Sequence, residues 1–227
     1  MSEMKQTPNP SRPPIALMLA VFFTAMAVLG FEVSLTRAFS VLLRFHFVFL
    51  AISLATCGLG LGGLIDFLLR RSVLKETAPV VVLSVWGSLC AALMPLSFLL
   101  LFASPLSAKL TSVWVVTVIC LPPYLAAGAF LSHAFAGWSG QGGRLYAADL
   151  VGASLGSFLV IGALQLLGGI NAGMSWGAVV GLGAIALCLS SPRKLTVITP
   201  LLVTLATIVL VWVNHSGAIV NLPVLPL

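Results

Sequence analysis

The sequence has very little charge. Only 7% of its residues are Asp, Glu, Lys or Arg, whereas a soluble domain carries roughly 25%. Apolar residues fill 60% of the 227 positions, which excludes a water-soluble fold. Eleven Lys and Arg outweigh five Asp and Glu, but most of these cations lie between apolar runs. We interpret the excess as a signal of membrane topology and not of nucleic-acid binding.

The sequence also lacks the patterns of metal, disulfide and catalytic sites. Its four cysteines all lie within apolar runs, and no two of them form C-x-x-C. The GQGG stretch at 140–143 follows no expected strand and does not have the spacing of a nucleotide-binding loop. The sequence therefore predicts no cofactor and no catalytic residue.

Long apolar runs are what the sequence does contain. A helix needs about 20 apolar residues to cross a bilayer, and only helices or closed barrels satisfy their backbone in lipid. Because the runs do not alternate, they predict an all-α, polytopic transmembrane helix bundle of about seven spans. The expected spans are Ile15–Leu43, Phe45–Leu69, Pro79–Phe102, Thr111–Phe135, Leu145–Leu167, Ile170–Leu189 and Leu195–Val213.

The distribution of Lys and Arg predicts the orientation of this bundle. Most of them fall in the first tail and in loops on one side of the seven spans, which predicts a cytoplasmic amino terminus. Residues 1–14 then form a disordered cytoplasmic tail, 15–213 the membrane domain and 214–227 a short external tail. The first apolar run is too long for a signal-peptide core, so we expect it to be retained in a bacterial cytoplasmic membrane.

Two of the expected spans carry stripes of small residues. Small residues let membrane helices approach closely without a hydrophobic driving force. The glycines concerned are Gly58, Gly60 and Gly62 in the second span and Gly152 and Gly156 in the fifth. We expect these two spans to form the tight centre of the bundle.

Ionisable residues within the spans are candidates for function, because a charge at membrane depth is costly. They are Glu32, Arg37, Asp66 and Asp149. Glu32 and Arg37 lie roughly 140° apart around a helix, so a neighbouring helix should supply a partner. Glu32 either forms a structural charge pair, binds a ligand or relays protons. Asp66 and Asp149 lie close to cationic residues at the cytoplasmic ends of their spans, and we favour a structural role for both. Asp149 is expected in the first turn of its helix, where the macrodipole stabilises an anion.

Two further features leave alternatives open. Pro122 and Pro123 stand in the middle of the fourth span, where they predict a helix break that either lines a substrate site or is a plain bend. His46 and His215 are expected toward the outer face, where they could hold a haem between them. His133 is expected at the inner face, too far away to join them.

Several stretches together resemble the membrane domain of polytopic spermidine-synthase-like proteins. The stretches are FEVSLTRAFSVLL (31–43), HFVFLAISLATCGLGLGG (46–63), LPPYLAAGAFLSHAF (121–135), RLYAADLVGASLGSFLV (144–160) and LGGINA (167–172). Their order along nearly the whole chain makes the resemblance more specific than any one motif. The positions that match the family pattern are Glu32, Arg37, Gly58, Gly60, Gly62, Tyr146, Asp149, Gly152 and Gly156.

The resemblance implies a membrane module without its enzyme. Members of that family continue into a soluble, Rossmann-like aminopropyltransferase domain, whereas this sequence ends at Leu227 without a nucleotide site. The chain is therefore not expected to catalyse aminopropyl transfer on its own. The leading hypothesis is a non-catalytic membrane subunit that packs against other membrane subunits, and a separately encoded soluble aminopropyltransferase-like protein is a further possible partner. One alternative is a small transporter for a cation or polyamine. The other is a haem-binding membrane component in electron transfer.

Overall fold

The computed structural model describes residues 14–42, 48–74, 77–102, 113–190 and 197–216. All regular secondary structure in these ranges is helical. The elements are α1 (Ile15–Leu42), α2 (Val48–Ser72), α3 (Pro79–Phe102), α5 (Val113–Gly137), the 3₁₀ turn η2 (Ser139–Gln141), α6 (Gly142–Leu189) and α7 (Ile198–His215). The expected all-helical fold is confirmed for the described part of the chain.

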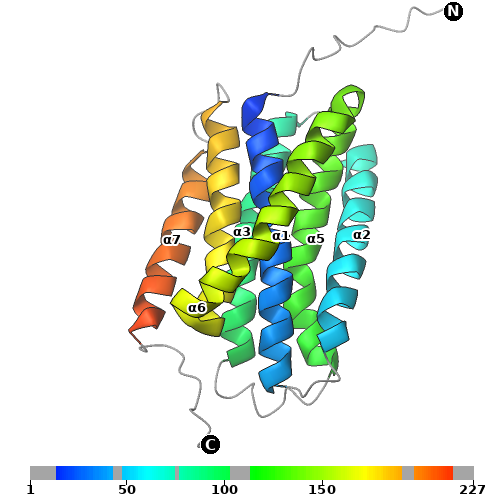
Figure 1. Cartoon of the computed structure of the whole chain (residues 1–227). Helices are drawn as coiled ribbons and strands as arrows, with labels where there is room; N and C mark the ends of the chain where they lie inside the picture. Colours follow the sequence, from blue (N-terminus) through cyan, green and yellow to red (C-terminus); the bar gives the residue numbers. More distant parts are fainter. Residues whose placement is uncertain (1–13, 43–47, 75–76, 103–112, 191–196, 217–227) are drawn as a thin grey trace, which may run out of the picture.

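In this part of the chain, six helical segments are long and apolar enough to cross a membrane. A helix forms most of its backbone hydrogen bonds internally, as a bilayer requires. The chain thus has the build of an integral membrane protein (Figure 1). The bounds of α3 are those expected from the sequence, and α1 begins at Ile15 as expected.

The helix α6 differs from the others because it contains a reversal of the chain. Its 48 residues would extend about 72 Å as one straight helix, more than twice the roughly 30 Å of a hydrocarbon core. Gly168 leaves the helical conformation at φ 78° and ψ 164°, and the chain turns back there (Figure 1). The expected spans Leu145–Leu167 and Ile170–Leu189 correspond to the two arms of α6. With both arms counted, the path agrees with seven crossings, and their number in a membrane stays a prediction.

α1 packs mainly on α6, whose first arm crosses it (Figure 1), and also on α2 and α5. α2 packs mainly on α5, while α3 packs on α5 and α6. α7 lies at the edge, against α6 and α3. Phe31 of α1 joins the centre through edge-to-face contacts with Phe98 and Tyr124, each at a ring separation of 5.5 Å.

The two glycine stripes pack against different neighbouring helices. Gly62 of α2 faces the α5 backbone so closely that a Cβ would collide with the carbonyl of Leu125. Gly152 and Gly156 of α6 likewise lie against the carbonyls of Phe22 and Met26 in α1. The two striped helices thus make two separate close contacts, and the expectation that they form one shared centre is wrong.

Gly58 and Gly60, both in the expected stripe of α2, have different surroundings. A Cβ on Gly58 would collide with the side chain of Tyr124, whereas one on Gly60 would meet nothing within 4 Å. Two residues rotate a helix by about 200°, so Gly60 points away from the face that Gly58 presents. The assignment of Gly60 to helix packing is therefore wrong within the described part of the chain.

Candidate functional site

The most deeply buried charged side chain described here is that of Asp66. It is fully buried in α2, and its Oδ1 lies 2.8 Å from Nδ1 of His133 in α5. His133 is itself only 7% exposed. An aspartate removed from water in this way needs a charged or hydrogen-bonding partner, and His133 supplies one from the neighbouring helix.

Arg70 completes the cluster from the next turn of α2. Its Nε lies 2.9 Å from Oδ2 of Asp66, and its side chain keeps 28% exposure. Its Nη2 donates to Oγ of Ser132 at 3.2 Å, and Ser132 donates in turn to the carbonyl of Gly63 at 3.4 Å. We call Asp66, Arg70, Ser132 and His133 the α2–α5 polar cluster. The guanidinium of Arg70 thus balances the charge of the Asp66 carboxylate.

Close packing of the two helices brings this cluster together. Gly62 of α2 and Gly128 of α5 lie where the backbones come nearest, one turn away from Asp66 and Ser132. A larger side chain at Gly62 or Gly128 would hold the helices apart. The small residues therefore position the charged ones.

His133 is the member of this site that sequence reasoning missed. The sequence places Asp66 close to cationic residues, and the structure shows that Arg70 pairs with it. The histidine is 67 positions away from Asp66, and it was considered only as a haem or metal ligand. A usable signal existed, because both residues were expected near the cytoplasmic ends of their spans, at the same depth.

The other charged candidates do not converge. Glu32 and Asp149 are both partly buried, Arg37 and Arg144 are exposed, and none of the four forms an ion pair within the described ranges. Among the residues described, no group of three or more His, Cys, Asp or Glu could hold a metal ion. The carboxylates thus form no common cation site in this part of the structure.

The expected position of Asp149 is wrong. α6 begins at Gly142, so Asp149 is the eighth residue of the helix and lies beyond its first turn. The free N–H groups that make a helix N-terminus positive belong to the first four residues. The macrodipole therefore contributes little at Asp149.

No break interrupts α5 at Pro122 and Pro123, because α5 is helical from Val113 to Gly137, while a plain bend at these prolines stays a prediction. A proline at position 123 leaves the carbonyl of Ile119 without its helical donor. The Oγ of Ser97 in α3 lies 2.8 Å from that carbonyl and 2.8 Å from the carbonyl of Leu93, so the one hydroxyl proton is shared between them. A side chain of the neighbouring helix thus compensates for a missing backbone donor, as membrane helices with internal proline require.

Tyr124, which follows these prolines, carries a hydroxyl group inside the bundle. Its side chain is completely buried, and within the described ranges its hydroxyl has no hydrogen-bond partner. The ring packs edge-to-face on Phe31, the neighbour of Glu32. Tyr124 is thus held by its ring.

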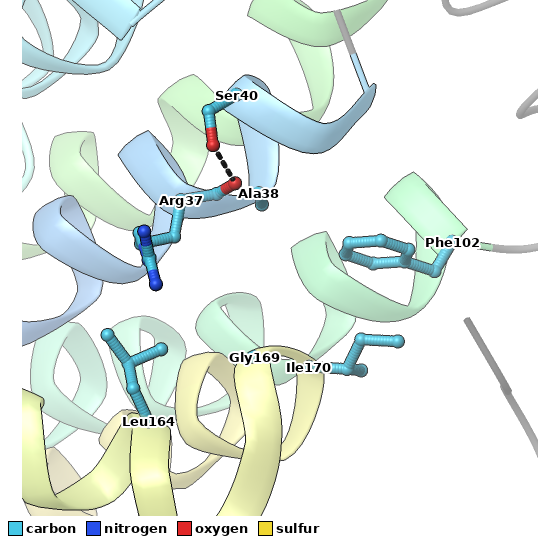
Figure 2. A pocket seen from close by; sticks show the side chains of 7 residues that line it. All are labelled: Arg37, Ala38, Ser40, Phe102, Leu164, Gly169 and Ile170. Atoms are coloured by element: carbon cyan, nitrogen blue, oxygen red, sulfur yellow. Dashed lines mark hydrogen bonds between the residues drawn. The ribbon is translucent and has the colours of Figure 1, made fainter. Parts of the chain in front are cut away.

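Arg37 lines a cavity of about 300 Å³ between α1, α3 and the turn of α6 (Figure 2). The guanidinium points toward Leu164, while Phe102 and Ile170 form the opposite side (Figure 2). Ser40 lines the cavity too, and its hydroxyl donates to the Arg37 carbonyl at 2.7 Å. A single unpaired cation therefore faces a largely apolar chamber.

The haem hypothesis is not tested. His46 lies outside the described residues. His215 is exposed at the end of α7, where it borders a cavity of about 290 Å³ together with Leu167 and Trp212.

No protein-family model, curated protein or solved structure matches this chain.

Proposed function

We propose that the chain is a non-catalytic integral membrane subunit that packs laterally against another membrane protein. The observation that carries this proposal is a row of exposed, mostly small residues on the first arm of α6. They are Gly143, Ala147, Leu150, Ser154, Ser157 and Ile161. Successive members are three or four positions apart, so they share one face of the helix.

This face is free because the arm packs on one side only. Its inner side, with Gly152 and Gly156, lies against α1. The outer hydroxyls are satisfied within the helix, since Ser154 donates to Leu150 and Ser157 donates to Ser154. What the face offers a partner is therefore small size and close approach, which is how helices associate in lipid.

The α2–α5 polar cluster supports the same proposal from inside the bundle. Asp66 is already paired with Arg70 and His133, an arrangement that locks two helices together. Because breaking a buried pair leaves a charge unpaired, the cluster favours one fixed arrangement of these helices. A bundle whose helices are held together in this way, with small residues exposed on the first arm of α6, fits a subunit of a larger assembly.

The resemblance to spermidine-synthase-like membrane domains indicates what the assembly would contain. In that family the membrane domain accompanies a soluble aminopropyltransferase domain. We include in the proposal a separate soluble protein of that kind as a possible second partner.

Co-purification in mild detergent tests the proposal. We expect a stoichiometric membrane partner with the wild-type chain and its loss with Ser154→Phe, which places bulk on the free face. Leu159→Phe is the matched control, because Leu159 is also exposed but lies roughly 140° around the helix from Ser154. A wild-type chain that purifies without any partner would argue strongly against a subunit role.

The α2–α5 polar cluster also favours a second function, movement of protons or cations. A fully buried carboxylate that contacts a histidine in a membrane helix is a common element of proton relays. His133→Gln keeps a hydrogen-bonding side chain but cannot carry a proton at neutral pH. Reconstituted vesicles in which this variant and the wild type take up protons and polyamines equally would remove the support for transport.

A further inference from the structure

The cavity beside Arg37 has a composition suited to an amphiphile. One wall provides a guanidinium, and the rest is formed mainly by Ala38, Phe102, Leu164 and Ile170. Gly169 adds no side chain, and a Cβ there would meet nothing within 4 Å. The space next to the cation is therefore open and lined by carbon.

Arg37 is available to a ligand. Its guanidinium has no ion pair or hydrogen bond within the described ranges, where the only ion pairs are those of Asp66. Ser40 uses its hydroxyl proton on the Arg37 backbone carbonyl, so its oxygen can only accept a further hydrogen bond. Among the described residues that line the cavity, Arg37 is thus the only charged one, and its charge favours an anion.

The position along the helix indicates where such a ligand would come from. Arg37 lies 22 residues after the start of α1, which corresponds to about 33 Å of helix. This distance places the guanidinium near the far edge of a hydrocarbon core of roughly 30 Å. Lipid phosphates lie at this depth, with acyl chains extending toward the membrane centre.

We propose that this cavity binds the phosphate of an anionic phospholipid. Arg37 would contact the phosphate, because a planar guanidinium forms paired hydrogen bonds with phosphate oxygens. Phe102, Leu164 and Ile170 would contact the first methylene groups of the lipid. Residues of α1, α3 and the turn of α6 line the site, so a bound lipid would contact all three elements.

The full chain, purified in mild detergent, provides the test. The probes are phosphatidylglycerol, phosphatidylcholine and inorganic phosphate, added separately while bound lipid is counted by native mass spectrometry and thermal unfolding is recorded. We expect phosphatidylglycerol to bind and to raise the unfolding temperature, with a weaker response to phosphatidylcholine. Inorganic phosphate should have little effect, because it makes no apolar contacts.

Two variants remove the site in different ways. Arg37→Gln should weaken phosphatidylglycerol binding about tenfold, the loss of one charge-assisted contact. Gly169→Leu should exclude the lipid by filling the cavity while Arg37 remains. The matched controls are Arg144→Gln, an exposed cation elsewhere, and Gly162→Leu, where a Cβ also meets nothing within 4 Å. Both controls should bind like the wild type.

The outcomes separate the two sources of phosphate and the case of no site. Loss of binding in both cavity variants, with both controls intact, supports the proposal. An equal response to inorganic phosphate would replace the lipid by a soluble anion and overturn it. Unchanged lipid binding in a folded Gly169→Leu variant would also overturn it, even if Arg37→Gln failed to fold.

Discussion

Nδ1 of His133 lies 2.8 Å from Oδ1 of Asp66 and joins α5 to α2 across 67 positions of sequence. The pair is nearly inaccessible to solvent, and Arg70, which contacts Asp66, is partly exposed. Around it the two helices touch backbone to backbone at Gly62 and Gly128. The glycines thus let the two helices approach closely enough for the Asp66 carboxylate to contact His133.

Asp66→Ala should destabilise the protein strongly, because it leaves Arg70 and His133 without their acceptor. We expect a loss of roughly 3 kcal/mol in the free energy of unfolding, the lower end for a broken buried pair, since Arg70 keeps partial access to water. Unfolding by a denaturing detergent in mixed micelles measures the loss. Asp149→Ala is the control, because Asp149 is only partly buried and forms no ion pair among the described residues. Equal effects of the two substitutions would contradict a special role for Asp66.

Gly62→Leu and Gly60→Leu form a matched pair of substitutions on different sides of α2. The first forces a side chain into the backbone of α5, while the second adds one where nothing lies within 4 Å. We expect Gly62→Leu to abolish the folded state or to lower its unfolding temperature sharply, because backbone cannot move aside. Gly60→Leu should purify and unfold like the wild type. Similar yields and unfolding temperatures for both variants would show that α2 does not pack on α5 through this face.

The outcome for these glycines illustrates what sequence can predict. The apolar runs predicted α3 from Pro79 to Phe102 correctly, because span length and hydropathy are local properties. Which side of α2 is buried, and against which helix, depends on the packing of distant segments. The same applies to Asp66, whose pairing with Arg70 is local while its contact with His133 is not. The pattern correctly marked Asp66 as unusual, but it could not identify the partner on α5.

The prolines of α5 also show that a local sequence pattern does not reveal contacts from a distant segment. Locally they predict a break, and the contact from Ser97 on α3 compensates for one of the two donors that the prolines remove. Ser97→Ala removes the donor to the Ile119 carbonyl and should lower stability by about 1 kcal/mol. The control is Ser72→Ala, whose exposed hydroxyl bonds only within its own helix. Unfolding in mixed micelles compares the two, and a loss no greater than that of Ser72→Ala would mean that the contact from α3 contributes nothing measurable.

The reversal of α6 depends on one backbone conformation. Gly168 has φ 78° and ψ 164°, a region that is essentially restricted to glycine, whereas Gly169 beside it is not among the positive-φ residues. Gly168→Ala should therefore lower the free energy of unfolding by roughly 1–3 kcal/mol through backbone strain, although a Cβ there meets no neighbour within 4 Å. Gly169→Ala, equally open, should be neutral or slightly stabilising, because it only reduces the freedom of the unfolded chain. Denaturation of both variants in the same micelles separates strain from loss of space, since crowding would affect neither. If the two substitutions had the same effect, the turn would have to lie elsewhere, and the two arms of α6 would no longer be defined by Gly168.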